Sequence, residues 1–385
     1  MQATNVLFIV YPAPRGGTPL CPSEAGRLRS GNSALDYLQI QAERNKKGPL
    51  MMNVSYINFD AARTISLKTV EERDTPGPGE VLVKSDYSAI SAGTETANLL
   101  GLPNTHGSFP WRPGYSTSGR VVSVGEGVTD FEPEMRVLVT WAGHRSHFIR
   151  PASSLVKIDE NVDQLEASFA HVACFPMLGV RKLKLEIGES AMVIGMGILG
   201  LFAAQIAQLS GAIPVIVSDL SPARRDLALR LGCDHALCPT DGDLAAKVKE
   251  LTGGKGVDTI VEVTGKSIAL QQALECVAEM GRISLLGCTR ISETPIDYYQ
   301  YVHRRGVSLI GAHTFSRPKV ESRPTAWTER DDYATFFKLV AAGKLQVRPI
   351  VSEVVAPAMV PAMYTRLIEE ENPPVGVVID WQQLG

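Results

Sequence analysis

The stretch Ala191–Asp219 limits the possible folds of this chain more than any other part of its sequence. It opens with a short apolar run, Ala191–Ile194, which predicts a buried strand. The glycine pattern GMGILG follows at residues 195–200, and small and apolar side chains at helical spacing come after it. A second apolar run then ends at Asp219. This order of strand, glycine turn, helix, strand and acid is typical of the first βαβ unit of a parallel sheet.

Each glycine of the pattern has its own steric reason. Gly195 makes the tight turn, Gly197 lets the backbone approach a pyrophosphate, and Gly200 lets helix and strand pack closely. The N-terminus of the following helix offers free N–H groups to the phosphates. Asp219 lies 19 residues after Gly200, where a carboxylate accepts hydrogen bonds from the hydroxyls of an adenosine ribose. The stretch therefore predicts a dinucleotide site, because a glycine-rich turn between buried elements leaves Asp219 unexplained.

Length and composition narrow the class of protein. A chain of 385 residues predicts two domains, and 44% apolar residues with 34 glycines suit a globular α/β protein. A net charge of −3 without a basic block gives no indication of nucleic acid or membrane partners. The six cysteines form no CxxC pair, so we expect no disulfide framework and a reducing, cytoplasmic setting. No apolar run approaches the roughly 18 residues of a membrane helix.

Changes of pattern along the chain predict four segments. Residues 1–50 are rich in Gly, Pro, Ser and Arg, which predicts a poorly ordered extension; a targeting or partner segment is the alternative. Strand patterns predict a twisted, barrel-like β domain over residues 51–180. Alternating strands and helices over residues 181–312 predict six parallel strands with helices on both faces. Residues 313–385 contain a helix and a final strand, and we expect them to return to the first domain.

The predicted elements have the following bounds. The strands of the β domain are expected at Val54–Phe59, Thr64–Val70, Glu80–Tyr87, Ser118–Val124, Arg136–Thr140, His147–Ile149 and Leu155–Ile158, with a late strand at Val375–Asp380. Those of the parallel sheet are expected at Ala191–Ile194, Pro214–Val217, His235–Leu237, Asp258–Val263, Arg282–Leu286 and Val307–Ile310. Helices are expected at Gln164–Glu186, Leu201–Leu209, Pro222–Leu231, Asp241–Leu251, Ile268–Glu279 and Asp331–Ala342.

Several motifs together resemble one superfamily. The run GTE at residues 93–95, PGYSTSGRV at residues 113–121, the glycine pattern, Asp219 and the run Glu262–Gly265 resemble the medium-chain dehydrogenase/reductase superfamily. The similarity is greatest to its zinc-type alcohol dehydrogenase branch, which includes sorbitol, threonine and bacteriochlorophyllide dehydrogenases. The resemblance implies a GroES-like β-barrel catalytic domain joined to a Rossmann domain with a doubly wound, parallel, six-stranded sheet. It also implies hydride transfer to a nicotinamide and a homodimer or homotetramer.

The resemblance also implies a set of cofactor contacts. We expect NAD rather than NADP, because the Asp219 carboxylate repels a 2′-phosphate. Arg224 and Arg225 weaken this argument, since either guanidinium is able to hold a phosphate. The expected cofactor-binding residues are Gly195, Gly197, Ile198, Leu199, Gly200, Asp219, Arg224, Thr264 and Gly287.

The chain departs from the superfamily at the zinc ligands. Zinc-dependent members carry Cys-Gly-Thr/Ser-Asp, whereas this chain has Ala92–Glu95, with Ser91 before it. Their Gly-His-Glu is replaced here by Gly114–Ser116, and the third ligand position falls near His171. One plausible ligand cannot hold a catalytic Zn²⁺, which needs three protein ligands. The resemblance therefore predicts a member without metal, and no cysteine-rich structural lobe follows Thr140.

Without zinc, a protein group must take the proton of the alcohol. Thr94 matches the proton-relay Ser/Thr of the superfamily, or it caps the helix after Gly93. His171 is either a base that titrates near neutrality or a histidine that packs between domains. Tyr115 replaces a ligand and is able to donate to a carbonyl, or it is a core aromatic. Glu95 is the charged partner of the relay, or it pairs with an arginine.

Two other groups of residues carry weaker predictions. His144 and His147 are expected at the surface. The loop Ala312–Lys319 follows the last parallel strand, and the carboxyl ends of such strands open onto the ligand crevice. Its polar and basic side chains favour a substrate with many hydroxyls, although a solvated loop has the same composition.

Three functions remain compatible with the sequence. The first is an NAD-dependent dehydrogenase that acts on a secondary alcohol in a sugar, cyclitol or other polyol, without zinc. The second is a zinc-free NAD(P)H quinone or enoyl-type reductase, against which Asp219 argues. The third is a dinucleotide-binding protein without catalysis, which does not require Thr94, Glu95 and His171.

Overall fold

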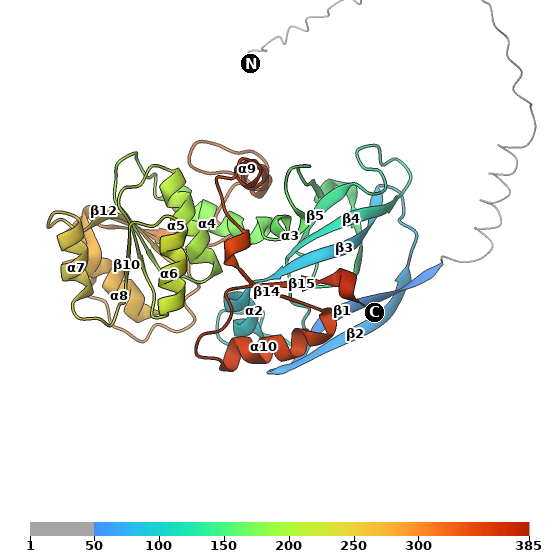
Figure 1. Cartoon of the computed structure of the whole chain (residues 1–385), viewed down its shortest axis with the longest axis horizontal. Helices are drawn as coiled ribbons and strands as arrows, with labels where there is room; N and C mark the ends of the chain where they lie inside the picture. Colours follow the sequence, from blue (N-terminus) through green and yellow to red (C-terminus); the bar gives the residue numbers. More distant parts are fainter. Residues whose placement is uncertain (1–49, 385) are drawn as a thin grey trace, which may run out of the picture. The chain divides into compact units, whose positions relative to one another are not determined.

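The computed structural model describes residues 50–384 (Figure 1). All but the last residue of the predicted extension, residues 1–50, therefore lies outside the described residues. The described residues form a seven-stranded sheet, a six-stranded sheet and a two-stranded hairpin. None of the helices in this part of the chain is both long enough and apolar enough to cross a membrane.

The seven-stranded sheet belongs to the GroES-like domain. Its strand order is β14-β15-β3-β4-β5-β7, with β6 paired to β3. Alternate residues of β15 pack on opposite faces, Val377 and Ile379 in one apolar cluster and Val378 in another, as the strand period requires. The strands are β3 (Glu80–Ile90), β4 (Ser116–Val124), β5 (Arg136–Thr140), β6 (His147–Pro151), β7 (Val156–Lys157), β14 (Val351–Val355) and β15 (Gly376–Asp380).

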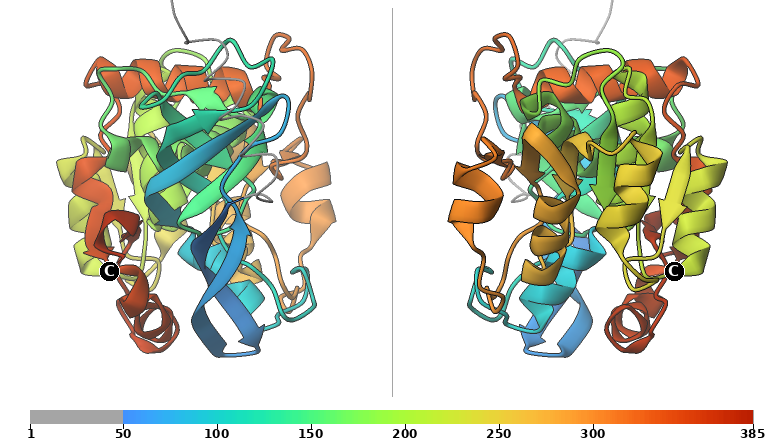
Figure 2. Two further views of the ribbon diagram at one scale, coloured as in Figure 1. Left: turned by 90° about the vertical axis from the view of Figure 1, so that its right-hand side faces the viewer. Right: turned by 90° about the vertical axis from the view of Figure 1, so that its left-hand side faces the viewer.

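A hairpin and two helices flank this sheet. Strands β1 (Met51–Ala61) and β2 (Thr64–Arg73) pair with each other, and α10 (Val360–Glu369) lies beside them and beside α2 (Ala92–Leu99) (Figure 2). The apolar face of α10 buries Tyr364 in this cluster. Strand β15, close to the C-terminus, pairs with β3 in the same sheet.

The six-stranded sheet is parallel throughout and has the order β10-β9-β8-β11-β12-β13. Its order reverses between β8 and β11, which opens a ligand crevice at the carboxyl ends of these strands. Helices α5 (Ile198–Leu209) and α6 (Pro222–Arg230) cover one face, and α7 (Leu244–Leu251) and α8 (Ser267–Cys276) cover the other. The strands are β8 (Ala191–Ile194), β9 (Val215–Ser218), β10 (His235–Leu237), β11 (Val257–Glu262), β12 (Val277–Leu285) and β13 (Ser308–Gly311). The predicted fold class is therefore confirmed.

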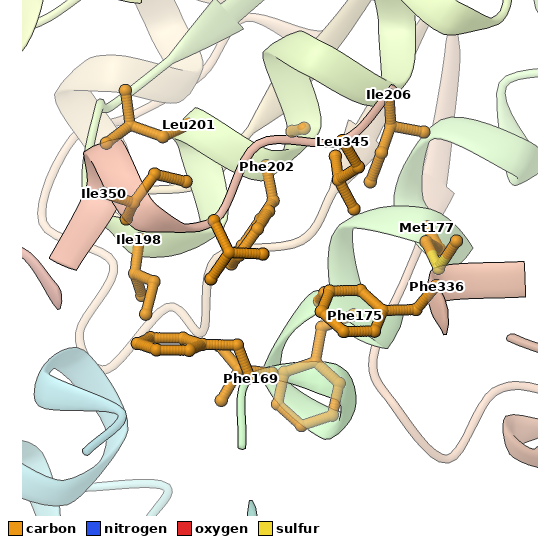
Figure 3. Packing of buried hydrophobic residues seen from close by; sticks show 14 of the residues in the cluster. Phe169, Phe175, Met177, Ile198, Leu201, Phe202, Ile206, Phe336, Leu345 and Ile350 are labelled. Atoms are coloured by element: carbon orange, nitrogen blue, oxygen red, sulfur yellow. The ribbon is translucent and has the colours of Figure 1, made fainter. Parts of the chain in front are cut away.

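Helix α4 (Ala170–Lys182) joins the two sheets and is buried on all sides over most of its length. An apolar helix of this kind belongs in a protein core. Phe169 and Phe175 pack with Phe202 of α5 and Phe336 of α9 (Glu329–Ala341) in one apolar cluster (Figure 3). This cluster holds the start of α4 against both sheets.

The element bounds differ from the predicted ones in a few places. The expected helix Gln164–Glu186 is divided into α3 (Gln164–Ala167) and α4, because the backbone turns at Ser168. The last residues of the expected helix Ile268–Glu279 were wrongly assigned, since Val277 pairs with Val257 and starts β12. Strand β14 and helix α10 have no counterpart in the predicted elements. The domain boundaries at residues 50, 180 and 312 stay predictions.

Candidate active site

The glycine turn after β8 has the geometry that a dinucleotide requires. Gly195 has φ +97°, and a Cβ atom there would lie 2.6 Å from Cγ2 of Thr264. A Cβ atom at Gly200 would lie 1.8 Å from the Gly195 carbonyl oxygen, so only glycine lets α5 pack on the turn. A Cβ atom at Gly197 would meet nothing within 4 Å. Gly197 is also the N-cap of α5. No side chain caps this end of the helix, so the first N–H groups of α5 are available to bind a phosphate.

Asp219 lies directly after β9 and faces this turn. Its carboxylate accepts hydrogen bonds from the backbone N–H groups of Met196, at 2.6 Å, and Ser221, at 2.8 Å. An ionised carboxylate has about four acceptor sites, so both oxygens retain a lone pair for a ribose. Arg225 donates to the carbonyl of Asp219, and Arg224 donates to the carbonyl of Pro373. Both guanidinium groups are thus engaged with the protein backbone.

The other expected cofactor contacts gather around the end of β11. Glu262 is buried there and accepts hydrogen bonds from Thr264, through both its N–H group and its hydroxyl, and from the Gly265 N–H group. Burial raises the pKa of the Glu262 carboxyl, and the bonds from Thr264 oppose this shift. A Cβ atom at Gly287 would lie 2.3 Å from the Gly265 nitrogen. The sequence reasoning gave Glu262 no role, although it lies inside the motif that carried the resemblance.

Two expected contacts, Ile198 and Leu199, form the first turn of α5. Ile198 is buried in the core, and Leu199 is half-buried and packs against the same cluster. Their N–H groups are among the first of the helix, which have no partner within it. We therefore expect backbone contacts from these residues rather than side-chain contacts.

His171 lies in the first turn of α4, enclosed by aromatic rings. Its ring centroid lies 4.7 Å from that of Trp141, 5.0 Å from Phe175 and 5.4 Å from Tyr115. Nδ1 is hydrogen-bonded to the hydroxyl of Tyr333 at 2.5 Å. Nε2 is buried and has no hydrogen-bond partner among residues 50–384. A buried polar atom without a partner is costly, and such atoms are common at ligand sites.

The charge state of His171 differs from the expected one. Burial, with the charge of Arg317 second, lowers the pKa of the imidazole to about 3. The expectation that this residue titrates near neutrality is therefore wrong, because the sequence did not reveal its complete burial. The imidazole is neutral at physiological pH.

The Thr94 hydroxyl lies near the phenol of Tyr115, and the Tyr115 ring lies 5.4 Å from that of His171. The Tyr115 hydroxyl is buried without a hydrogen-bond partner among the described residues. Burial raises the pKa of the Tyr115 phenol, the charge of Glu95 raises it further, and the nearby hydroxyls of Ser91 and Thr94 oppose this shift. Ser91, not Thr94, is the N-cap residue of α2, so the capping alternative for Thr94 is wrong.

Glu95 takes part in a buried network that fixes α2. Its carboxylate accepts hydrogen bonds from the Ser91 N–H group at 2.9 Å, from His144 Nε2 at 3.0 Å and from the Tyr364 hydroxyl. Nδ1 of His144 lies 2.9 Å from the Ser88 hydroxyl, which also accepts a bond from Trp381. The partner of Glu95 is therefore a histidine rather than an arginine.

His144 was expected at the surface, but it is fully buried. Gly114, with φ +104°, makes this possible, since a Cβ atom there would lie 2.5 Å from Cγ of His144. The pairing of a glycine with a distant histidine leaves no signal in a single sequence. His147, by contrast, is half-buried on β6, and its Nδ1 lies 3.1 Å from the Ser146 hydroxyl.

Two known protein families match two successive parts of this chain. "Alcohol dehydrogenase GroES-like domain" matches residues 77–175, and "Zinc-binding dehydrogenase" matches residues 199–329. The chain belongs to the medium-chain dehydrogenase/reductase superfamily. It is therefore an oxidoreductase of the dehydrogenase type.

Individual members of the superfamily are similar over most of their length. The 2-dehydro-3-deoxy-L-galactonate 5-dehydrogenase of Pseudoalteromonas atlantica is 28% identical over 308 residues, which are 72% of this chain and 85% of that protein. The L-threonine 3-dehydrogenase of Pyrococcus furiosus is 29% identical over 312 residues, 72% of this chain and 84% of that protein. The crystal structure of a putative zinc-binding dehydrogenase from Sinorhizobium meliloti bound to NADP has a TM-score of 0.73 at 20% identity, over 86% of this chain and 99% of that one.

The superfamily implies zinc, and one set of possible donor groups lies beside His171. Ligand atoms of His171, Cys174 and Glu329 lie within 4.8 Å of one another. However, the Tyr333 hydroxyl bonds both His171 Nδ1 and Glu329 Oε2. The Cys174 thiol donates to the His171 carbonyl at 2.9 Å, and burial raises the pKa of this thiol well above its usual range. Zinc binds a thiolate, so a metal ion here would require Cys174 to lose its proton and Tyr333 to release His171 and Glu329.

The loop after β13 differs from its expected character. The Arg317 side chain is buried, where it donates to the carboxylate of Asp332 and to the carbonyl of Cys174, both at 2.8 Å. The exposed ring of Phe315 instead lies 5.6 Å from Trp141. Trp141 has φ +55°, a strained conformation for a large residue that is enriched at functional sites. Trp141 and Phe315 therefore add two exposed aromatic rings near His171, and Arg317 ties α4 to α9 and to the loop after β13.

Proposed function

We propose that this chain is an NAD-dependent dehydrogenase that transfers hydride between a secondary alcohol and nicotinamide without a catalytic metal. The observation that carries the proposal is the buried Nε2 of His171, a neutral acceptor without a partner among residues 50–384. Helix α4, which bears this histidine, is tied by Arg317 to the carboxyl end of the sheet, where the crevice opens. A buried acceptor at this place suits a substrate hydroxyl.

The substrate class of the proposal is a polyol, such as a sugar acid, a sugar or a cyclitol. Relatives support this class, since one is a dehydrogenase of 2-dehydro-3-deoxy-L-galactonate and another is a D-guloside 3-dehydrogenase of Escherichia coli. Trp141 and Phe315 present ring faces, on which the C–H face of a sugar ring packs well.

The nicotinamide cofactor supplies the hydride acceptor when it is bound, and Gly195–Gly200 with Asp219 would hold it. The residues of the chain then orient and deprotonate the alcohol. Nε2 of His171 accepts the hydroxyl proton, and the Thr94 and Tyr115 hydroxyls donate hydrogen bonds to the substrate oxygen. A base placed in this way typically contributes about 10²- to 10⁴-fold to the rate.

The preference for NAD rests on Asp219. Its carboxylate is held next to the glycine turn by two backbone N–H groups, where it would repel a 2′-phosphate. The two neighbouring arginines are bound to backbone carbonyls, which supports the same preference. The five cysteines among the described residues are free, which agrees with a cytoplasmic, reducing setting. By analogy with other members of the superfamily, we propose that the chain forms a homodimer or a homotetramer.

A substrate panel with metal analysis tests the proposal. The purified chain is mixed with NAD and a series of polyols and cyclitols, and NADH absorbance is followed. We expect oxidation of a secondary alcohol, substoichiometric zinc and no effect of chelators. One tightly bound zinc per subunit would contradict the metal-free mechanism. Activity restricted to quinones or activated double bonds with NADPH would favour a reductase instead.

A further inference from the structure

A hydrogen-bonded chain leads from His171 to a half-buried carboxylate. The Tyr333 hydroxyl lies 2.5 Å from His171 Nδ1 and 3.2 Å from Oε2 of Glu329. Tyr333 and Glu329 are one turn apart in α9. His171 and Tyr333 are buried, whereas Glu329 is half-buried and is thus within reach of solvent. The sequence analysis singled out neither of these two residues.

The chemistry of the three groups fixes the direction of both hydrogen bonds. An ionised carboxylate only accepts, so the Tyr333 O–H group donates to Glu329. The phenol oxygen has no second proton, so His171 Nδ1–H must donate to it. Burial raises the pKa of the Tyr333 phenol, the neighbouring Cys174 and Glu329 raise it further, and the nearby Thr140 hydroxyl opposes this shift. His171 is therefore the Nδ1–H tautomer, and its buried Nε2 carries a lone pair.

We propose that Glu329, Tyr333 and His171 form a proton relay that removes the hydroxyl proton of the substrate, with Tyr333 and Glu329 as positioning and proton-carrying residues behind His171. This inference rests on the proposed function. In the oxidation direction the hydride leaves the carbinol carbon for the nicotinamide, which is the oxidant. The substrate O–H bond breaks, and an Nε2–H bond forms.

The remaining proton movements keep the imidazole neutral. The Nδ1–H bond breaks as a new O–H bond forms on Tyr333, and the original Tyr333 proton moves to Oε2 of Glu329. The products are the ketone, the reduced nicotinamide and a protonated Glu329, which releases its proton to solvent. Exchange with water then restores the Nδ1–H tautomer after the ketone leaves.

The relay resolves a difficulty that a lone histidine base would meet. Burial among aromatic rings, and then the charge of Arg317, disfavour an imidazolium ion at His171, and no carboxylate of residues 50–384 is hydrogen-bonded to the ring. The titratable groups near His171 are Cys174 on its own helix, Tyr115 before β4, Tyr333 and Glu329 on α9, and Arg317 on the loop after β13. Among them, only Glu329 is able to store the proton, since the cysteine and both tyrosines are buried and Arg317 is already charged.

The tautomer is tested first, without any substrate. The intact chain is labelled with ¹⁵N-histidine, and the two-bond ¹⁵N–¹H NMR spectrum is recorded from pH 5 to 8, with His171→Gln to assign the signal. We expect a neutral ring, protonated at Nδ1 only, and a loss of this preference in Tyr333→Phe. A native ring protonated at Nε2 overturns the relay, because its hydrogen bonds would then run in the opposite direction.

Kinetics test whether the relay carries the proton. We expect Tyr333→Phe and Glu329→Gln each to lower kcat by about 10²-fold, with KM and NAD affinity nearly unchanged. The proton inventory of kcat in mixtures of light and heavy water should be curved for the native chain and linear for Tyr333→Phe. Tyr301→Phe is the matched control. The Tyr301 hydroxyl donates a hydrogen bond of 3.4 Å to Glu275, outside the site, so its removal should leave kcat unchanged.

Two negative results have different meanings. If the native chain and both relay variants oxidise an alcohol equally fast, the relay is overturned and the proposed function stands. If the native chain oxidises no alcohol, the proposed function is overturned, and with it the catalytic use of the relay.

Discussion

The glycine turn and the crevice around His171 are built in opposite ways. In the turn, Gly195, Gly197 and Gly200 lie within six consecutive residues, and their spacing is set by backbone sterics alone. Around His171, the rings come from separate segments of the chain, among them the loop before β4, the turn after β5 and α9. The turn has no room for a Cβ atom at Gly195 or Gly200, whereas the site around His171 depends on which side chains converge. A site made of consecutive residues can thus be predicted from the sequence, whereas a site made of distant residues is recognised only in the folded structure.

The largest expected effect breaks the turn itself. Gly200→Val places a Cβ atom only 1.8 Å from the Gly195 carbonyl oxygen. Helix α5 must therefore move away from the sheet. We expect the free energy of unfolding to fall by about 4 kcal/mol, above the usual range for overpacking. Denaturant unfolding measures this loss.

Gly197→Val is the matched control, because a Cβ atom at Gly197 meets nothing within 4 Å. We expect this variant to fold with native stability but to lose dinucleotide binding, since the added methyl groups occupy the phosphate position. Calorimetric titration with NAD measures the loss. Equal stability of the two variants would show that the contact at Gly200 is not needed.

The second effect concerns the crevice. His171→Ala should lower turnover by about 10²- to 10⁴-fold, while NAD affinity stays nearly unchanged, because the base acts on the substrate and not on the cofactor. Steady-state kinetics and NAD titration separate the two quantities. His147→Ala is the control, since this half-buried histidine lies on β6 and its ring is hydrogen-bonded to the neighbouring Ser146 side chain. A variant of His171 with normal turnover would move the base to another residue, and Tyr115→Phe would then be the next test.

The third prediction tests whether Asp219 sets the preference for NAD over NADP. Asp219→Ala should narrow the preference for NAD over NADP by about 10- to 100-fold, which corresponds to the loss of one or two hydrogen bonds to a charged group. The ratio of kcat/KM values for the two cofactors measures it. Asp130→Ala, which removes an exposed charge in the other domain, should leave the ratio unchanged. A native chain without any preference would contradict the assignment.

The smallest effect is a pH dependence of stability. The pKa of His171 is about 3 in the folded state and about 6.5 in the unfolded state, so only the unfolded chain gains this proton between these values. Stability is therefore lost as the pH falls below 6.5. Relative to His171→Asn, the native free energy of unfolding should fall by about 2 kcal/mol between pH 6.5 and 5. Chemical denaturation at several pH values measures this difference, and a constant difference would show that His171 is not buried as a neutral ring.

The sequence predicted the architecture well because alternation and glycine spacing are local signals. The six parallel strands and the turn at Gly195–Gly200 follow from such signals. Strand β14 and helix α10 were missed, since Val351–Val355 is short and α10 follows it after only a short connection. The end of the helix before β12 was misplaced because pairing with β11 overrides local propensity.

The candidate site could be predicted only in part. Resemblance located His171 and Tyr115 by counting from motifs, and the structure brings these two rings to 5.4 Å. It could not show that Tyr333, 162 residues later, bonds the same histidine. It also assigned His144 to the surface, because the burial of a histidine against Glu95 depends on the space left by Gly114. Such partners are defined by tertiary packing and have no fixed spacing.

The bond between Ser88 and Trp381 sets an order of events during synthesis, because its partners are 293 residues apart. At about 5 to 20 residues per second, a ribosome needs roughly 15 to 60 s to make the chain between them. The nucleotide-binding sheet lies in one uninterrupted stretch and is complete well before that. The first half of the catalytic domain is synthesised earlier, but its packing is completed later. Glu95 and His144 lack part of their hydrogen-bond network until Tyr364 and Trp381 have been synthesised. The domain that is translated first is therefore the one that matures last, and this interval is when chaperones are most needed.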